Sequence, residues 1–406
     1  MKLKSFLAVA AGSAVLAGAL VGIGTPALAD PAAATAVAGG GSDTTQDVMD
    51  AIAKAVAPST IGSWNALPVH STIQTHSGTT CATITRPNGS GEGVTALRRS
   101  LSGTFKSGTS GPTYPNTTAT YSAGTGNNPP ALGSQCFEFA RSSGGPGTNA
   151  STTGNLQYVP FALDGLTSAN GPASGTDATV ITDTFTFAQL QAMYTSGTNV
   201  TIGAKTYDPN PADGTTGTAI HLLIPQSGSG SRAFWLAAMG ITGAVPAWVK
   251  DTFVPTAGGA AQSVEENDGT PVRLDHNAIM PFSIAQWIAQ STGHNDRRDG
   301  ARLMNVSGLA PISGGKLNAS FVPQLLREVY NVIPFNATTA AGAALIPNGT
   351  TLYNFFVNPS ASNPLRLCGR TSLITEYGFG VLNGTGGFHT CGQIVSTLRA
   401  YSDAQW

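Results

Sequence analysis

Small hydroxyl residues and glycines gather directly before expected helices at three places in the chain. They occupy residues 41–45, 89–93 and 228–232, and a fourth polar turn covers residues 140–143. The first N–H groups of a helix have no intrahelical acceptor, and the helix dipole favours negative charge there, so such a joint can bind an anion. One such joint is an ordinary N-cap. Four in one chain, three of them rich in glycine, indicate anion binding.

The elements that must position these joints are strands and helices in alternation. Residues 220–240, IHLLIPQSGSGSRAFWLAAMG, run from apolar through small polar to apolar, which predicts a buried strand followed by a helix. The segment GSDTTQDVMDAIAKAV predicts another helix, with Thr44 and Asp47 forming a capping box. If such helices follow parallel strands, their N-termini converge on one crevice of the sheet.

The amino-acid composition excludes some classes of binding partner. The chain has 406 residues, enough for two domains or one discontinuous fold. Charged residues make up 10% against roughly 25% in an average protein, while 41% hydrophobic residues suffice for a packed core. The net charge of −1 indicates neither nucleic acid nor an anionic membrane as a partner. We expect a monomer that binds a small solute.

The N-terminus predicts secretion. Lys2 and Lys4 precede an apolar stretch at 6–23, and Ala27–Ala29 forms a small-x-small cleavage site before Asp30. The alternative is a retained membrane anchor, because the apolar run is nearly long enough to span a bilayer. No cysteine lies near the cleavage site, so we expect an extracellular protein without a lipid anchor.

Four cysteines in an exported chain predict two disulfides. Of the three pairings we favour Cys81–Cys136 and Cys368–Cys391, because each pair is close in sequence and brackets a stretch rich in Gly, Ser and Thr. A zinc site is the rival, but no CxxC pair occurs.

Several loop motifs occur in an order known from one family. GSDTTQDVM, GSGEGV, FEFARSSGGP, SGSGSRAFW and VEENDGT are followed by LLREVYNVIP and LITEYGFGVL. Together they resemble the phosphate-type substrate-binding proteins of ABC transporters. The resemblance implies an α/β, two-lobed type II periplasmic-binding-protein fold with two crossover strands and a ligand cleft between the lobes. It also implies phosphate as the ligand and an ABC permease as a partner.

Two positions depart from that family's pattern. The place of an Asp that accepts a hydrogen bond from protonated phosphate falls on Ser143, and the place of an anion-binding Arg falls near Pro225. Arg141 and Arg232 could supply the positive charge instead, because an arginine fork matches an oxyanion. Asp43 is either a plain cap or the missing acceptor. Sulfate, another oxyanion or a small carboxylate therefore stays open as the ligand.

The predicted organisation is a signal peptide (1–29), a flexible leader (30–40) and two lobes. The first lobe comprises 41–162 and 280–406, and the second comprises 163–279. The crossings, QYVPFALDG and AIMPFSIAQ, form the hinge. The residues expected to contact the ligand are Asp43, Thr44, Thr45, Ser90, Arg141, Ser142, Ser143, Gly228, Ser229, Gly230, Ser231 and Arg232.

We expect no catalysis, cofactor or metal. No GxSxG elbow or HExxH occurs, and EENDGT lacks the alternating carboxylates of a calcium loop. The charged segment HNDRRDG at 294–300 is expected to be solvated. Two other classes remain: a secreted hydrolase, such as a glycosidase with distant carboxylates or an esterase, and a wall-associated structural or adhesion protein. The latter predicts internal repeats, which the sequence does not show.

Overall fold

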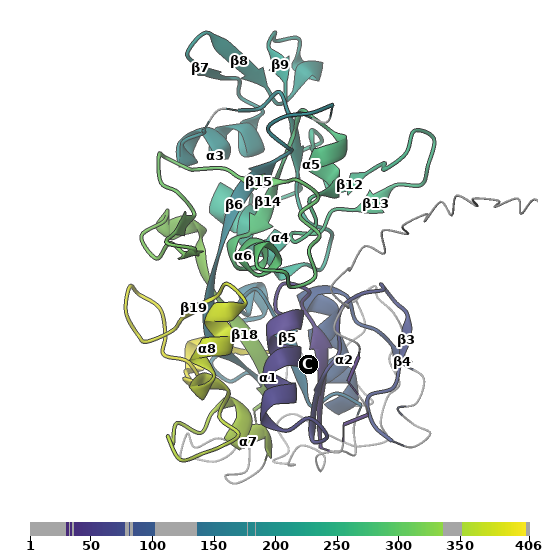
Figure 1. Cartoon of the computed structure of the whole chain (residues 1–406), viewed down its shortest axis with the longest axis vertical. Helices are drawn as coiled ribbons and strands as arrows, with labels where there is room; N and C mark the ends of the chain where they lie inside the picture. The colour runs from purple at the N-terminus through teal and green to yellow at the C-terminus, as the bar shows by residue number, and fades with distance from the viewer. Residues whose placement is uncertain are drawn as a thin grey trace, which may run out of the picture.

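The computed structural model describes residues 30–402 apart from 32, 35, 78–80, 82–83, 102–135, 177, 183 and 336–350. The expected signal peptide lies outside the described residues. The chain forms two α/β lobes stacked along the long axis of the molecule, with the first lobe at the bottom and the second at the top of Figure 1. This arrangement confirms the predicted two-lobed α/β fold.

One sheet runs through both lobes. Its strand order is β11 (Val249–Lys250), β10 (His221–Leu223), β14 (Ala278–Ser283), β6 (Leu156–Asn170), β18 (Leu326–Pro334), β5 (Phe139–Ser142), β1 (Val37–Gly41) and β2 (Ile61–Ser63). The long strand β6 pairs with β18 along its first two thirds and with β14 near its end, antiparallel in both cases. Strand β6 is thus the first predicted crossing, and the second predicted segment, AIMPFSIAQ, forms β14 and the start of α6, but the chain runs back into the first lobe with β18.

The first lobe packs helices against the parallel strands β2, β1 and β5. These helices are α1 (Gln46–Val56), α2 (Gly89–Leu101), α7 (Thr351–Phe356) and α8 (Thr371–Glu376). Val48 and Ile52 of α1, which share one helical face, join Phe139 of β5 and Phe356 of α7 in one buried cluster. The rings of Phe139 and Phe356 lie 4.9 Å apart between centroids.

The leader prediction fails for residues 37–40, which belong to the fully buried strand β1. The sequence VAGGG was interpreted as flexible, but its glycines allow close packing. A Cβ on Gly39 would lie 2.3 Å from the Phe139 ring, so only glycine fits between the neighbouring strands.

The second lobe has a hydrophobic core of its own. It contains α3 (Phe187–Ser196), α4 (Gly230–Met239), α5 (Thr270–Leu274) and the small sheet β7 (Val200–Ile202), β8 (Lys205–Asp208) and β9 (Thr218–Ala219). Tyr194 of α3 and Trp235 of α4 pack edge to face in this core. Phe321 and Leu325 pack in the same cluster, and β15 (Arg302–Leu303) pairs with β6. The prediction placed these later residues in the first lobe, whereas the structure packs them on the second.

The remaining elements are short. Helix α6 (Ile284–Ser291) follows β14 directly. The two-residue strands are β3 (Thr72–Ile73), β4 (Ile84–Thr85), β12 (Thr252–Phe253), β13 (Gln262–Ser263), β16 (Ile312–Ser313), β17 (Lys316–Leu317), β19 (Gly380–Val381) and β20 (Arg399–Ala400). The 3₁₀ turns are Gly147–Asn149, Pro211–Asp213, Pro323–Leu325, Leu367–Gly369 and Ser396–Leu398. Among the described residues, no helix combines the length and apolar character that a membrane crossing requires.

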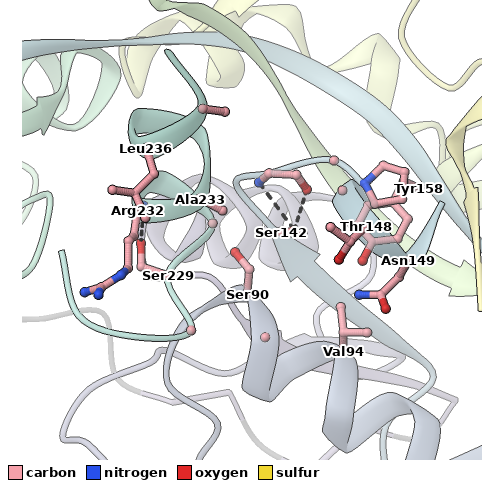
Figure 2. Close-up of a pocket in the computed structure, with 18 of the residues that line it drawn as sticks. Ser90, Val94, Ser142, Thr148, Asn149, Tyr158, Ser229, Arg232, Ala233 and Leu236 are labelled. Carbon is pink, nitrogen blue, oxygen red and sulfur yellow. Dashed lines mark hydrogen bonds between the residues drawn. The ribbon is translucent and has the colours of Figure 1, made fainter. Parts of the chain in front are cut away.

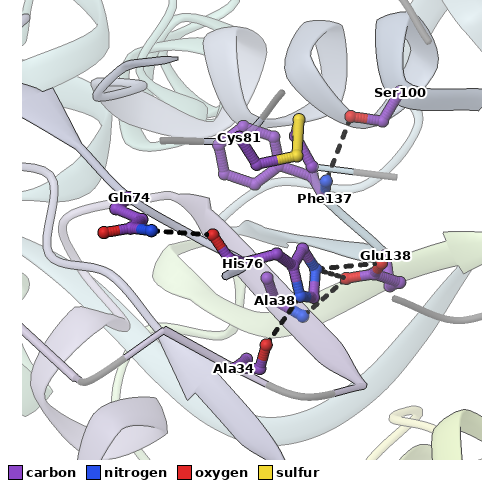
Figure 3. The surroundings of a disulfide bond; sticks show 9 residues. Ala34, Ala38, Gln74, His76, Cys81, Ser100, Phe137 and Glu138 are labelled. Atoms are coloured by element: carbon purple, nitrogen blue, oxygen red, sulfur yellow. Dashed lines mark hydrogen bonds and ion pairs between the residues drawn. A yellow bond between two sulfur atoms is a disulfide. The ribbon is translucent and has the colours of Figure 1, made fainter. Parts of the chain in front are cut away.

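Both predicted disulfides are confirmed, Cys81–Cys136 and Cys368–Cys391. The first spans 55 residues of sequence, and a loop of that size stabilises a fold by about 4 kcal/mol on the chain-entropy account. Figure 3 shows Cys81 beside the Phe137 ring, and below it a buried pair in which His76 Nε2 lies 3.0 Å from Glu138. The disulfide joins the loop after β3 to the segment before β5, and Glu138 also accepts from the Ala38 N–H of β1 at 2.6 Å.

Candidate functional site

Hydroxyl groups from both lobes meet where the lobes touch. Thr44 Oγ1 lies 3.3 Å from Ser231 Oγ, and Ser143 Oγ lies 3.4 Å from the same atom. Ser143 in turn lies 3.3 Å from Ser90, oxygen to oxygen. We call Thr44, Ser90, Ser143, Ser229 and Ser231 the hydroxyl cluster. The structure therefore brings together residues from all four predicted joints.

The local sequence explains how α4 reaches this place. Ser229 is its N-cap, and Ser229 Oγ accepts from the backbone N–H groups of Ser231 (3.1 Å) and Arg232 (3.2 Å). Gly230 lets the first lobe come close, since a Cβ there would lie 2.6 Å from Ser90 Oγ and 2.8 Å from Ser143 Oγ. The backbone N–H of Gly91 also donates to the Gly228 carbonyl across the lobes at 3.0 Å.

The start of α1 differs from the prediction. Its N-cap is Thr45, with no side-chain cap bond, and not Thr44 in a capping box with Asp47. Thr44 does not cap the helix because its Oγ1 donates to Glu266 of the second lobe at 2.5 Å. Helix α2 begins at Gly89, so the segment expected as a turn before the helix is its first turn.

A carboxylate that the sequence analysis missed occupies the centre of the hydroxyl cluster. Glu266 Oε1 accepts from Thr44 and Ser231, the latter at 2.6 Å, and Oε2 accepts from Ser229 at 3.0 Å. Glu266 is fully buried. Its segment, VEENDGT, was given as one of the family-like loop motifs, but Glu266 was not among the residues expected to contact the ligand. No local pattern marks it for burial, because two of its hydroxyl partners are more than 30 residues away and the third is in the other lobe.

Two further carboxylates lie beside Glu266. Carboxylate oxygens of Asp43, Glu265 and Glu266 lie within 4.8 Å of one another. Burial, and after it repulsion by Glu266, raises the pKa of Asp43 well above its ordinary value and that of Glu265 to about 7. Asp43 Oδ2 and Glu265 Oε2 have no hydrogen-bond partner among the described residues. This acidic cluster therefore holds a proton near neutral pH.

Arg297 supplies the positive charge near the acidic cluster. It opposes the rise in the pKa of both Asp43 and Glu265. Its Nε and Nη2 are buried without a hydrogen-bond partner among the described residues. The expectation that residues 294–300 are simply solvated is therefore wrong for this side chain. The three carboxylates are close enough to chelate a cation, but Arg297 would repel one.

Neither arginine predicted to bind the ligand offers its guanidinium to the hydroxyl cluster. Arg141 is fully buried, and it donates to the Ser42 carbonyl (3.0 Å), Ser63 Oγ (2.8 Å) and the Trp64 carbonyl (2.6 Å). Burial lowers the pKa of Arg141 to about 10. A further bond runs from Nη2 to the Gly41 carbonyl, so the guanidinium of this β5 residue holds the ends of β1 and β2 through three carbonyls and one hydroxyl.

Arg232 also points elsewhere. Its Nη1 donates to the Pro225 carbonyl and to Asp251 Oδ2, both at 2.8 Å, and Figure 2 shows the side chain directed away from Ser90. Of the other predicted residues, Ser142 Oγ donates to the Gly144 carbonyl of its own turn, whereas Thr45 Oγ1 is buried without a partner among the described residues.

A cavity of about 560 Å³ opens beside the hydroxyl cluster. Figure 2 shows it between α4, with Ser229, Ala233 and Leu236, and the Ser142 turn and Tyr158, with Ser90 of α2 at its floor. Because Ser90 and Ser229 belong both to the cavity wall and to the hydroxyl cluster, the two spaces are neighbours.

Several solved structures are similar to the chain. A phosphate transport receptor of the ABC type from Vibrio cholerae has 14% identity and a TM-score of 0.43, over 85% of this chain and 99% of that one. A putative phosphate ABC transporter substrate-binding protein from Clostridium perfringens, solved with phosphate, has 13% identity and a TM-score of 0.45, over 86% and 99%. PstS from Borrelia burgdorferi has 14% identity and a TM-score of 0.36, over 85% and 97%. No protein-family model and no curated protein matches the sequence.

Proposed function

We propose that the protein is a secreted solute-binding protein whose lobes close on a small oxyanion, with phosphate favoured, for ABC-type uptake or scavenging. The observation that carries this proposal is the place of Glu266. One carboxylate accepts hydroxyl hydrogens from both lobes, so the hydroxyl cluster already fits a group with two equivalent anionic oxygens. A free oxyanion with the same oxygen spacing satisfies the same donors.

The surroundings strengthen the binding of such an anion. All five hydroxyl side chains of the cluster are buried, so their dipoles act at low dielectric, where each hydrogen bond is worth more than in water. The neighbouring acidic cluster holds a proton near neutrality, which reduces repulsion of an entering anion. A protonated carboxyl also donates, and an ionised one accepts from a protonated oxyanion such as hydrogen phosphate. Arg297 balances the remaining charge.

In this arrangement Glu266 competes with the ligand for the hydroxyl donors. A bound oxyanion displaces the Glu266 carboxylate, and the order of the sequence motifs supports phosphate as that oxyanion. The replacement Glu266→Gln keeps the side-chain shape and removes the negative charge. We therefore expect it to raise the affinity for phosphate roughly tenfold, because a buried like charge is lost.

The test compares the melting temperature of the wild type and of Glu266→Gln in phosphate, sulfate, acetate and succinate. A ligand that binds the folded state raises the melting temperature by mass action. Glu376→Gln is the matched control, because that carboxylate is 52% exposed, and it should bind as the wild type does. Absence of any shift with every anion in both proteins contradicts the proposal, and turnover of a chromogenic glycoside or ester would favour the hydrolase class.

A further inference from the structure

The cavity between α2 and α4 points to an organic group on the ligand. We propose that the site also takes an organic phosphoryl compound, a phosphonate or a phosphate monoester, and binds it more tightly than inorganic phosphate. Its phosphoryl oxygens bind the hydroxyl cluster, and its uncharged substituent fills the cavity. The phosphoryl half of this inference rests on the proposed function, and the substituent half rests on the cavity alone.

Size is the first argument. Pockets that bind drug-sized organic ligands have volumes of roughly 300–1,000 Å³. This cavity has a volume of about 560 Å³. A bare tetrahedral anion is accommodated by the hydroxyl cluster and would leave the cavity unused. The walls come from both lobes, from Ser90 and Val94 of α2 and from Ala233 and Ala237 of α4. A substituent held there would bridge the lobes and favour their closure.

The chemistry of the wall is the second argument. Apolar surface comes from Val94, Tyr158, Ala233, Leu236 and Ala237, and none of the lining residues is acidic.

The polar lining groups are largely engaged with one another. Asn149 Nδ2 donates to the Tyr401 hydroxyl at 3.2 Å, and Ser142 Oγ donates to a backbone carbonyl. Arg232, the cationic side chain of the lining, is paired with Asp251. The cavity therefore suits an uncharged and mainly apolar group, and it offers nothing for a second anion.

Continuity is the third argument. Ser90 and Ser229 line the cavity and also belong to the hydroxyl cluster, where Ser229 Oγ contacts the Glu266 carboxylate. A phosphoryl group that replaces this carboxylate would contact Ser229 Oγ, whose residue also lines the cavity. A substituent on phosphorus or on an ester oxygen can then enter the cavity without leaving the hydroxyl donors.

The test measures the affinity of the full mature chain for inorganic phosphate, methylphosphonate, propylphosphonate and glycerol 3-phosphate by calorimetry. Propylphosphonate should bind roughly tenfold more tightly than methylphosphonate, because it buries two more methylenes. The ester arm distinguishes monoesters from phosphonates as the source of the phosphoryl group. Equal affinity for the propyl and methyl compounds overturns the inference. If inorganic phosphate binds in that case, the proposed function still stands, whereas binding of none of the four probes contradicts both.

A cavity-filling variant makes the test specific. Ala237→Trp fills the cavity two helical turns away from Gly230, and it should abolish the propyl advantage while keeping the affinity for inorganic phosphate within about twofold. Ala188→Trp is the matched control, an exposed alanine on α3 of the same lobe outside the cavity lining, and it should keep the propyl advantage. If Ala237→Trp melts well below the wild type, Ala237→Leu replaces it with a smaller added volume. A propyl advantage that survives filling overturns the inference, as does an equal loss of affinity for inorganic phosphate.

Discussion

The molecule has two buried carboxylate sites near the crossing between the lobes: Asp164 and the acidic cluster. They differ in how completely their carboxylate oxygens are hydrogen-bonded. In the crossing strands, Asp164 Oδ1 accepts from Ser283 Oγ (3.0 Å) and the Ala285 N–H (3.1 Å). Its Oδ2 accepts from Arg327 Nη2 at 2.8 Å. Both oxygens of this carboxylate are therefore satisfied by β14, α6 and β18.

The acidic cluster of the cleft lacks such a set of donors. Asp43 and Glu265 each have a buried oxygen without a hydrogen-bond partner among the described residues, and Glu266 accepts from the hydroxyl groups of Thr44, Ser229 and Ser231. A fully hydrogen-bonded buried carboxylate fixes structure, whereas an incomplete one keeps a capacity for a proton or a ligand. Burial of charge alone therefore does not distinguish the two sites. The carboxylate oxygens of Asp43 and Glu265 that have no partner among the described residues do.

The largest expected effect comes from breaking the Asp164 site. Arg327→Met leaves Asp164 buried without its cation, and loss of one partner of a buried pair costs about 3–5 kcal/mol of unfolding free energy. Urea unfolding followed by circular dichroism measures this cost. The comparison is wrong if Arg327→Met unfolds within 1 kcal/mol of the wild type.

An exposed pair provides the control for that prediction. Arg298 pairs with Asp296 at 2.7 Å, and the side chains are 24% and 47% exposed. Because solvent screens such a pair, Arg298→Met should cost less than about 1 kcal/mol.

The second expected effect concerns closure of the cleft. Gly230→Ala places a methyl group 2.6 Å from Ser90 Oγ and 2.7 Å from the Gly144 nitrogen. Overpacking of this kind costs about 1–3 kcal/mol, so the affinity for the ligand should fall roughly 10- to 100-fold. Small-angle scattering should show an increased radius of gyration.

Gly243→Ala is the matched control for closure, because a Cβ at Gly243 meets nothing within 4 Å and its φ is not positive. It should change neither the radius nor the affinity. If both glycine variants bind alike, close contact at Gly230 does not limit closure.

The sequence predicted the features that depend on residues close together in the chain. The small residues at 228–232 predicted a joint between a strand and a helix, where the structure has the N-cap Ser229, and the spacing of the four cysteines gave the correct pairing. The crossing strand β6 was recognisable as a long apolar run without helical period.

The parts it missed depend on contacts between distant residues. Thr44 and Glu266 are 222 residues apart, so no local pattern distinguishes a carboxylate in the cleft from one in a solvated turn. Arg141 was expected to contact the ligand because it lies in a family-like loop and an arginine fork matches an oxyanion, but its register in β5 turns its fork toward β1 and β2. Arg297 was interpreted as part of an exposed charged segment, because its place near the acidic cluster also depends on contacts between distant residues.

The third expected effect compares two helix caps. Thr186 caps α3 in a capping box far from the cleft, and Ser229 caps α4 while also donating to Glu266. Thr186→Ala should cost about 1 kcal/mol, the usual worth of a cap. Ser229→Ala should cost about 1 kcal/mol more, because a hydrogen bond to a charged group is lost as well. Thermal unfolding of both variants measures the difference, and equal costs would show that Ser229 acts as a cap alone.

The smallest expected effect tests the proton held in the cleft. Because burial and Glu266 raise the pKa of Glu265 from 4.5 to about 7, the folded chain holds a proton there that the unfolded chain has lost. The group therefore stabilises the fold fully below about pH 4.5, and this contribution is lost as pH rises to 7 and beyond. Glu265→Gln cannot titrate, so its unfolding free energy should fall less between pH 4.5 and 8. The difference should be on the order of 1 kcal/mol, since Asp43 keeps a raised pKa and takes up part of the proton. A Glu265→Gln profile parallel to that of the wild type would place the proton elsewhere and remove the contrast with Asp164.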